Sequence, residues 1–342
     1  MEGIADRARR AAPAPVKRVL RTPWTWVRAA QQRRLLSRVS NQYPLLPGII
    51  SGYHAGTSDP EVVEVLGFLR TSDAQMLPYR WVEEYRPEDI DVCRDASGMV
   101  RATVEAASVY FPAALSEQNV AEAVAGALAE QDPRSPHAYW CGALDLRPDD
   151  VAVLVGASDG IYALHLVDRV ARLYLFEADG AWTDALERTL EPWRHKVVII
   201  PKYVGDQDGE STVTLDAFFA AEGVQPNYLQ ADVEGGELAL LNGAQGILAA
   251  ADRIAVSICC YHHQEDQATL ECILHETGLR THTTPGYMVL WPQLLSPPYL
   301  RRGVIHAMKW RNLRERTEHE ARDALRTEHC PQTGTPSMVP RS

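Results

Sequence analysis

The second half of the chain alternates between short apolar runs and stretches with helical spacing, and this alternation constrains the fold most. The apolar runs cover residues 151–155, 172–177, 196–203, 227–231 and 254–260. Helical spacing covers residues 161–170, 181–194, 236–250 and 265–277. Strands that alternate with helices pair in parallel within one sheet. The pattern therefore predicts a doubly wound α/β sheet that binds ligands at the carboxyl ends of its strands.

The end of this region departs from a purely parallel sheet. Residues 279–291 form two strand-like runs around the turn Pro285–Gly286, which predicts a terminal hairpin with an antiparallel last strand. A dinucleotide-binding domain does not need such a hairpin.

The first half of the chain carries other local patterns. They predict an amphipathic helix over 24–40, a loop over 41–56, a helix over 59–72 capped by Asp59, a β-hairpin over 89–111 around the turn 95–98, and a helix over 115–132 capped by Ser116. We therefore divide the chain into a basic arm with a helical extension (1–85), a hairpin and helix leader (86–140), an α/β domain (141–310), and a C-terminal helix and tail (311–342).

Charge and composition narrow the class of protein. Residues 1–40 carry a net charge of +8 and the rest of the chain −19, and an acidic body argues against nucleic-acid binding. The basic arm could meet anionic lipid, an acidic partner or the body itself, or stay solvated.

No apolar run is long enough to span a bilayer and no secretory signal is evident, so we expect a cytoplasmic protein. None of the six cysteines forms a C-x-x-C pair. Whether the chain forms a homo-oligomer stays open.

The turn after the first apolar run of the alternating region is a candidate cofactor loop. It consists of Gly156, Ala157, Ser158, Asp159 and Gly160. Gly156 lets the backbone approach a ligand closely, and Gly160 allows a sharp turn into the helix that follows. A nicotinamide dinucleotide site needs a third glycine to cradle the pyrophosphate, whereas S-adenosylmethionine has no pyrophosphate. Glu177 and Ala178 follow the second run, where a carboxylate accepts the ribose hydroxyls of either cofactor.

Two further segments carry a specific signature. The first contains Leu215–Asp216, expected in a strand, and the second is D-V-E-G-x-E-x-x-x-L-x-G-A over 232–244. Together with the leader 130–140 and the segments 261–266 and 285–288, they resemble the FkbM family of S-adenosylmethionine-dependent methyltransferases over residues 86–310. The resemblance implies a seven-stranded, mostly parallel methyltransferase sheet, with 141–310 as the cofactor-binding domain. The family usually has an acid where this chain has Leu154, and an arginine where it has Ala138.

The resemblance also implies roles for residues near the cofactor. His137 and Tyr139 of the leader would cover it, and Tyr203 and Asp206 would lie near the adenine. The alternatives are a plain turn at 205–209 and a leader that is only pinned to the core.

The candidate catalytic residues follow the fourth and fifth apolar runs. We expect His262 to take a proton from the acceptor hydroxyl, with Asp232 or Glu234 orienting it. The alternative roles are structural: Asp232 binding backbone amides, Glu234 favoured near a helix N-terminus, and His262 simply hydrogen-bonded. A Mg²⁺ ion held by the same three residues is a further alternative.

The function implied is an O-methyltransferase that acts on a hydroxyl of a sugar or another small polar metabolite. The rival hypotheses are a non-catalytic protein that keeps the fold, an enzyme of the same fold with another reaction, and a nicotinamide-dependent oxidoreductase.

Overall fold

The structure is a computed structural model that describes residues 45–140, 146–290 and 296–310. The predicted basic arm, the helix over 24–40 and the C-terminal helix and tail lie outside the described residues. Across those three described ranges, no helix combines the length and the apolar character needed to cross a bilayer.

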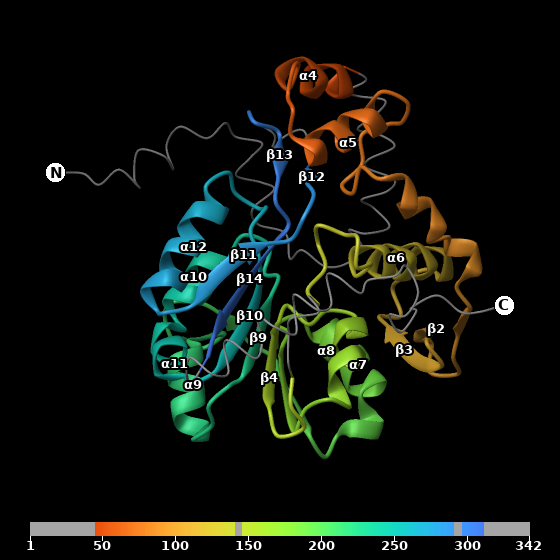
Figure 1. The fold of residues 1–342 in the computed structure, drawn as a ribbon. Coiled ribbons are helices and arrows are strands. Elements are labelled where there is room, and N and C mark those ends of the chain that lie inside the picture. The colour runs from red at the N-terminus through yellow and green to blue at the C-terminus, as the bar shows by residue number, and fades with distance from the viewer. Residues whose placement is uncertain (1–44, 141–145, 291–295, 311–342) are drawn as a thin grey trace.

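A seven-stranded sheet forms the centre of the protein (Figure 1), which confirms the predicted fold class. Its strands, in spatial order, are β11 (Arg280–Thr283), β14 (Val304–Lys309), β10 (Ile254–Cys259), β9 (Tyr228–Ala231), β4 (Val151–Val155), β5 (Arg172–Phe176) and β6 (Val197–Ile200). From β10 to β6 the neighbours are parallel, whereas β14 is antiparallel to both β10 and β11. The chain reverses its direction of strand addition between β4 and β9, where open α/β sheets bind ligands.

Helices cover both faces of this sheet, as Figure 1 shows. Those on one face are α7 (Ile161–Val167) and α8 (Gly180–Thr189), and those on the other are α9 (Leu215–Glu222), α10 (Glu237–Asn242), α11 (Gln245–Ala250) and α12 (Asp266–Glu276). In β4, Ala152 and Leu154 join the core on the α7 side, and Val153 and Val155 join the core on the α10 side. Successive strand residues face opposite ways, so the unbroken apolar run of β4 fills two cores.

The leader forms a small separate sheet and a helix beside α8. The strands β1 (Val92–Arg94), β2 (Val100–Val104) and β3 (Ala107–Phe111) pair antiparallel in chain order, so the hairpin predicted around 95–98 forms and β3 extends it. Ser116 accepts a hydrogen bond from the backbone N–H of Asn119 and caps α6 (Glu117–Glu130), as predicted. Phe111 packs edge-on against Trp182 of α8, which holds the leader against the sheet domain.

Two N-terminal helices, α4 (Leu46–Tyr53) and α5 (Pro60–Leu69), lie above the short pair formed by β12 (Met288–Val289) and β13 (Leu300–Arg301) (Figure 1). The cap predicted at Asp59 is present, since its carboxylate accepts the N–H groups of Glu61 and Val62. The loop predicted over 41–56 is wrong over α4, because Pro47 suits the first turn of a helix.

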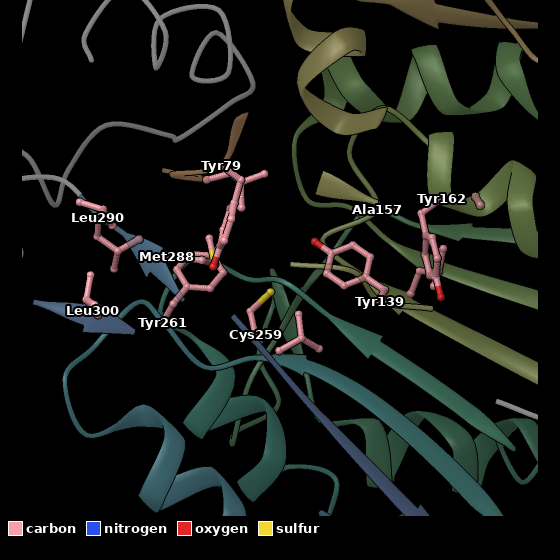
Figure 2. Packing of buried hydrophobic residues seen from close by; sticks show 14 of the residues in the cluster. Tyr79, Tyr139, Ala157, Tyr162, Cys259, Tyr261, Met288, Leu290 and Leu300 are labelled. Atoms are coloured by element: carbon pink, nitrogen blue, oxygen red, sulfur yellow. The ribbon is translucent and has the colours of Figure 1, made fainter. Parts of the chain in front are cut away.

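The chain that follows α5 is fastened to β12 by side-chain and backbone contacts. The Tyr79 hydroxyl accepts the N–H of Tyr287 at 2.7 Å, and its ring lies close to Met288 in the buried cluster of Figure 2. The N–H of Val289 donates to the carbonyl of Met76 at 3.0 Å. These contacts bring Met76 to the sheet edge where the cavity described below lies.

The hairpin predicted over 279–291 is wrong. Residues 280–283 pair with β14 instead, and 288–289 pair with β13. The run Val304–Lys309 is almost wholly buried and can pair on both of its edges. A local hairpin would have left the edge of β10 unpaired.

Smaller boundaries also differ from the prediction. Leu215–Asp216 opens α9 rather than lying in a strand, and the Asp216 carboxylate accepts the N–H groups of Gly246 and Ile247. The helix predicted over 236–250 divides into α10 and α11 at Gly243, where a side chain would meet the carbonyl oxygen of Gly205 at 2.0 Å. The run 196–203 ends at Ile200, and the short strand β7 (Tyr203–Val204) pairs with β8 (Thr212–Val213).

Candidate cofactor and active site

A cavity of about 460 Å³ lies at the carboxyl ends of the central strands, where the strand order reverses. Its wall comes from the loops after β4, β5, β6, β9 and β10, from the last residues of α6, and from the leader segment that contains His137 and Tyr139. The cavity therefore occupies the position that the sequence predicts for a ligand.

The loop after β4 is held by a close approach of two backbones. Gly156 has a φ of +79°, and a side chain there would meet the carbonyl oxygen of Asp232 at 2.0 Å. The expected close approach at Gly156 is thus to the loop after β9, although the residue also lines the cavity. Gly160, with a φ of +75°, makes the expected turn into α7, where a side chain would contact Leu186.

Glu177, directly after β5, connects two loops of the cavity wall. Its carboxylate accepts the N–H of Ser158 at 3.0 Å and the N–H of Asp179 at 2.9 Å. Burial raises the pKa of Glu177 above its usual value, although the backbone hydrogen bonds oppose this shift. The side chain also lines the cavity.

Asp232, directly after β9, is the centre of a polar cluster. Its Oδ2 accepts the Tyr139 hydroxyl at 2.7 Å and lies 3.5 Å from both the Tyr261 hydroxyl and His137 Nε2. Burial opposes ionisation of Asp232, but His137, His262 and the Tyr139 hydrogen bond outweigh it and hold the pKa of this carboxyl far below its usual range. Asp232 is therefore a carboxylate at neutral pH.

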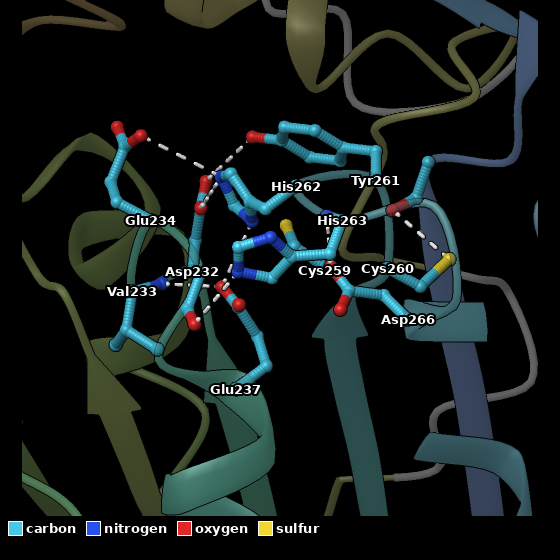
Figure 3. Close-up of polar contacts among 12 residues, drawn as sticks. Asp232, Val233, Glu234, Glu237, Cys259, Cys260, Tyr261, His262, His263 and Asp266 are labelled. Carbon is cyan, nitrogen blue, oxygen red and sulfur yellow. Dashed lines mark hydrogen bonds and ion pairs between the residues drawn. The ribbon is translucent and has the colours of Figure 1, made fainter. Parts of the chain in front are cut away.

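His262 lies beside Asp232, with three carboxylates around its ring (Figure 3). Its Nδ1 is 3.1 Å from Glu237, and its Nε2 is 3.6 Å from both Asp232 and Glu234. Burial would lower the pKa of His262, but the carboxylates, Glu237 first, raise it to about 9. Both ring nitrogens are buried, and the residue does not line the cavity. This position, away from the cavity and with a raised pKa, gives no support to the base role expected for His262.

Comparison with known proteins identifies the domain that contains this cavity. Residues 122–283 match the family model of the methyltransferase FkbM domain. The chain carries a methyltransferase FkbM domain. This family implies S-adenosylmethionine as the methyl donor. Comparison with curated proteins found no significant match.

Solved structures similar to the chain include other methyltransferases. A methyltransferase FkbM from Methylobacillus flagellatus KT has 17% identity and a TM-score of 0.40, over 55% of this chain and 54% of that one. The chain thus spans only about half the length of that relative. A putative RNA methyltransferase from Pyrococcus horikoshii has 15% identity and a TM-score of 0.35, over 55% of this chain and 84% of that one.

Most of the predicted site residues come together in the FkbM domain. Those that line the cavity are Gly156, Ala157, Ser158, Asp159, Glu177, Ala178, Tyr203, Asp232, Glu234, His137 and Tyr139. Gly160 and His262 do not line the cavity. Asp206 is exposed on the turn after β7 and is not part of the lining, so the structure gives no support to its predicted contact with adenine.

Sequence reasoning missed several lining residues of the FkbM domain. Glu130 and Gln131 come from the end of α6, and the Gln131 side chain accepts the N–H of Tyr139. Tyr261 also lines the cavity, and its hydroxyl contacts His137 at 3.1 Å. Its position beside His262 at the end of a strand was a usable signal. Nothing in the sequence indicated that α6 would reach the sheet edge.

The side chains around Asp232 do not fit Mg²⁺. Among the described residues, two groups could converge on a metal: Asp232 with Glu237 and His262, and Asp232 with His137 and Cys259. Mg²⁺ prefers six oxygen ligands, and each group contains nitrogen or sulfur. Burial raises the pKa of the Cys259 thiol, which keeps it protonated. We therefore assign no step to Mg²⁺.

Proposed function

We propose that this protein is an S-adenosylmethionine-dependent O-methyltransferase whose acceptor is a hydroxyl of a sugar or another small polar metabolite. One observation carries the proposal: the Gly156 loop, Glu177 and Asp232 border one cavity at the strand-order reversal. The acceptor class rests on the family resemblance together with the polar wall formed by His137, Tyr139, Asp232 and Tyr261.

The cavity wall fits a nucleoside cofactor. Gly156 and Ser158 both line the cavity, and the buried Ser158 Oγ has no hydrogen-bond partner among the described residues. Glu177 would accept the ribose hydroxyls, and Tyr203 would lie near the adenine. When bound, S-adenosylmethionine supplies an electrophilic methyl group on a sulfonium.

Asp232 is our candidate for the proton acceptor in place of His262. A hydroxyl oxygen that gains a methyl group becomes a strongly acidic oxonium, so even a carboxylate of low basicity can remove its proton. Tyr139 holds one oxygen of Asp232 in place, and the charged His262 lies on the other. The role of His262 is then to fix and polarise the carboxylate rather than to titrate.

The direct test of the function compares ligands and products. S-adenosylhomocysteine should bind in calorimetry and raise the melting temperature, and NAD should do neither. Incubation with S-adenosylmethionine and a panel of hydroxylated metabolites should add fourteen daltons to a product in mass spectrometry. Binding of NAD alone would support the oxidoreductase hypothesis. Binding of S-adenosylhomocysteine without any methylated product across a broad panel would favour the non-catalytic hypothesis.

Replacing Glu177 with alanine should weaken S-adenosylhomocysteine binding by about 1.5–3 kcal/mol, the range for hydrogen bonds to charged groups. Calorimetry gives the affinity. Because Glu177 also accepts two backbone N–H groups, the melting temperature of the unliganded variant must be measured alongside. Glu187→Ala, an exposed position on α8, is the matched control. Unchanged affinity in Glu177→Ala would remove Glu177 from the cofactor site.

A further inference from the structure

A buried acid in the cofactor loop has no partner for one of its oxygens. Asp159 is 6% exposed and lines the cavity. Its Oδ1 accepts the N–H of Ile161, the first residue of α7, at 2.9 Å. Its Oδ2 is buried and, within the described part of the chain, receives no hydrogen bond. A buried carboxyl oxygen without a donor is costly, so a ligand group is the natural partner.

The surroundings of Asp159 favour a cation at this oxygen. Glu130, the last residue of α6, lines the same cavity and acts electrostatically on Asp159, His137 and Tyr139. Burial first, and then Glu130, raise the pKa of Asp159 to about 7. No described cation contributes to that shift. A positively charged ligand group placed here would replace the proton and relieve the repulsion between the two acids.

Strand β4, which precedes this loop, lacks an acid that the family resemblance leads us to expect. The FkbM resemblance places an acid at position 154, but Leu154 is apolar, 1% exposed and lines the same cavity. Position 154 is the last residue but one of β4, directly before the loop that holds Asp159. The acid that the resemblance leads us to expect is thus absent from β4, while Asp159, with one unpartnered oxygen, lies five residues later.

We propose that Asp159, faced by Glu130, binds the ammonium group at the amino-acid end of the cofactor and so takes over the role of the acid absent at Leu154. This inference rests on the proposed function, because it assumes that the cavity holds S-adenosylmethionine. The bond would be a charge-assisted N–H···O contact to Oδ2, while Oδ1 keeps its place at the start of α7.

Two ligands separate this contact from the rest of the pocket. S-adenosylhomocysteine carries the ammonium, and 5′-methylthioadenosine keeps the adenosine and the thioether but lacks the amino-acid end. In calorimetry, Asp159→Asn should weaken S-adenosylhomocysteine at least about tenfold, as expected for a charged hydrogen bond. It should change 5′-methylthioadenosine less than about twofold. Glu130→Gln should show the same selectivity with a smaller loss.

A double variant distinguishes the loss of the acidic group from a general disturbance of the loop. Adding Leu154→Asp to Asp159→Asn returns an acid to the same wall, and should recover part of the S-adenosylhomocysteine affinity without affecting 5′-methylthioadenosine. Equal losses for both ligands, or no loss for either, would overturn the role of Asp159 while leaving the proposed function intact. If the unmodified protein binds neither ligand, the proposed function fails, and this inference fails with it.

Discussion

Asp232→Asn should lower kcat by about 10²–10⁴-fold, the usual contribution of a general base. The substitution keeps the size of the side chain and an oxygen that can accept the Tyr139 hydroxyl, but it removes the group that receives the proton. The affinity for S-adenosylhomocysteine should change far less than kcat, because Glu177 and the Gly156 loop remain. Single-turnover methylation and calorimetry on the same preparation separate the two effects.

The same experiment decides between Asp232 and His262. His262→Gln should reduce turnover less than Asp232→Asn, since the ring only stabilises the carboxylate in our mechanism. The opposite ranking, with an active Asp232→Asn, would restore the base role predicted for His262. Asp252→Asn, an exposed aspartate remote in sequence from the cavity loops, serves as the matched control and should leave kcat unchanged.

Gly156→Ala should destabilise the fold by about 3 kcal/mol or more. A left-handed backbone costs a non-glycine residue about 1–2 kcal/mol, and forcing atoms into a filled space costs about 1–3 kcal/mol more. Here the new methyl group would lie 2.0 Å from the carbonyl oxygen of Asp232. We expect a fall in melting temperature of at least roughly 5 °C, together with weakened cofactor binding as the two loops separate.

Gly67→Ala provides the control for Gly156. Gly67 is exposed within α5, and a side chain there would meet nothing within 4 Å. It should be neutral or stabilise the protein by up to about 1 kcal/mol. A Gly156→Ala variant as stable as Gly67→Ala would show that the two loops do not rely on their close contact.

The fold was largely predictable, because it depends on patterns that are local in sequence. The run 151–155 is β4 without a change of boundary, and the caps at Asp59 and Ser116 are where propensity places them. The partner of β11 was not predictable in this way. The local turn at Pro285–Gly286 suggested a hairpin. Instead, β11 pairs with the distant run 304–309, which is almost wholly buried.

The site was predictable in its placement but not in its chemistry. Strand-end loops converge by topology, so Gly156, Glu177 and Asp232 could be predicted to border one cavity from their positions after strands and from the local motifs. The protonation of His262 depends instead on Glu237, which a helical turn brings beside the ring, and on burial. Glu237 belongs to the D-V-E-G-x-E signature, but the signature indicates neither its contact with the ring nor the burial of the pair. The contact of Asp206 with adenine stays a prediction, since the residue is exposed and does not line the cavity.

The position of β14 bears on how this protein can be divided. The family match ends at residue 283, before β14 and before Arg301, which donates to the carbonyls of Tyr261 and His262. A fragment trimmed to residues 122–283 would leave the whole edge of β10 open to self-association. It would also remove the Arg301 contacts that hold the loop after β10, and the contacts of Tyr79 with Tyr287. Recombinant fragments intended to fold should therefore retain everything from α4 to Lys309, well beyond the stretch by which relatives are recognised.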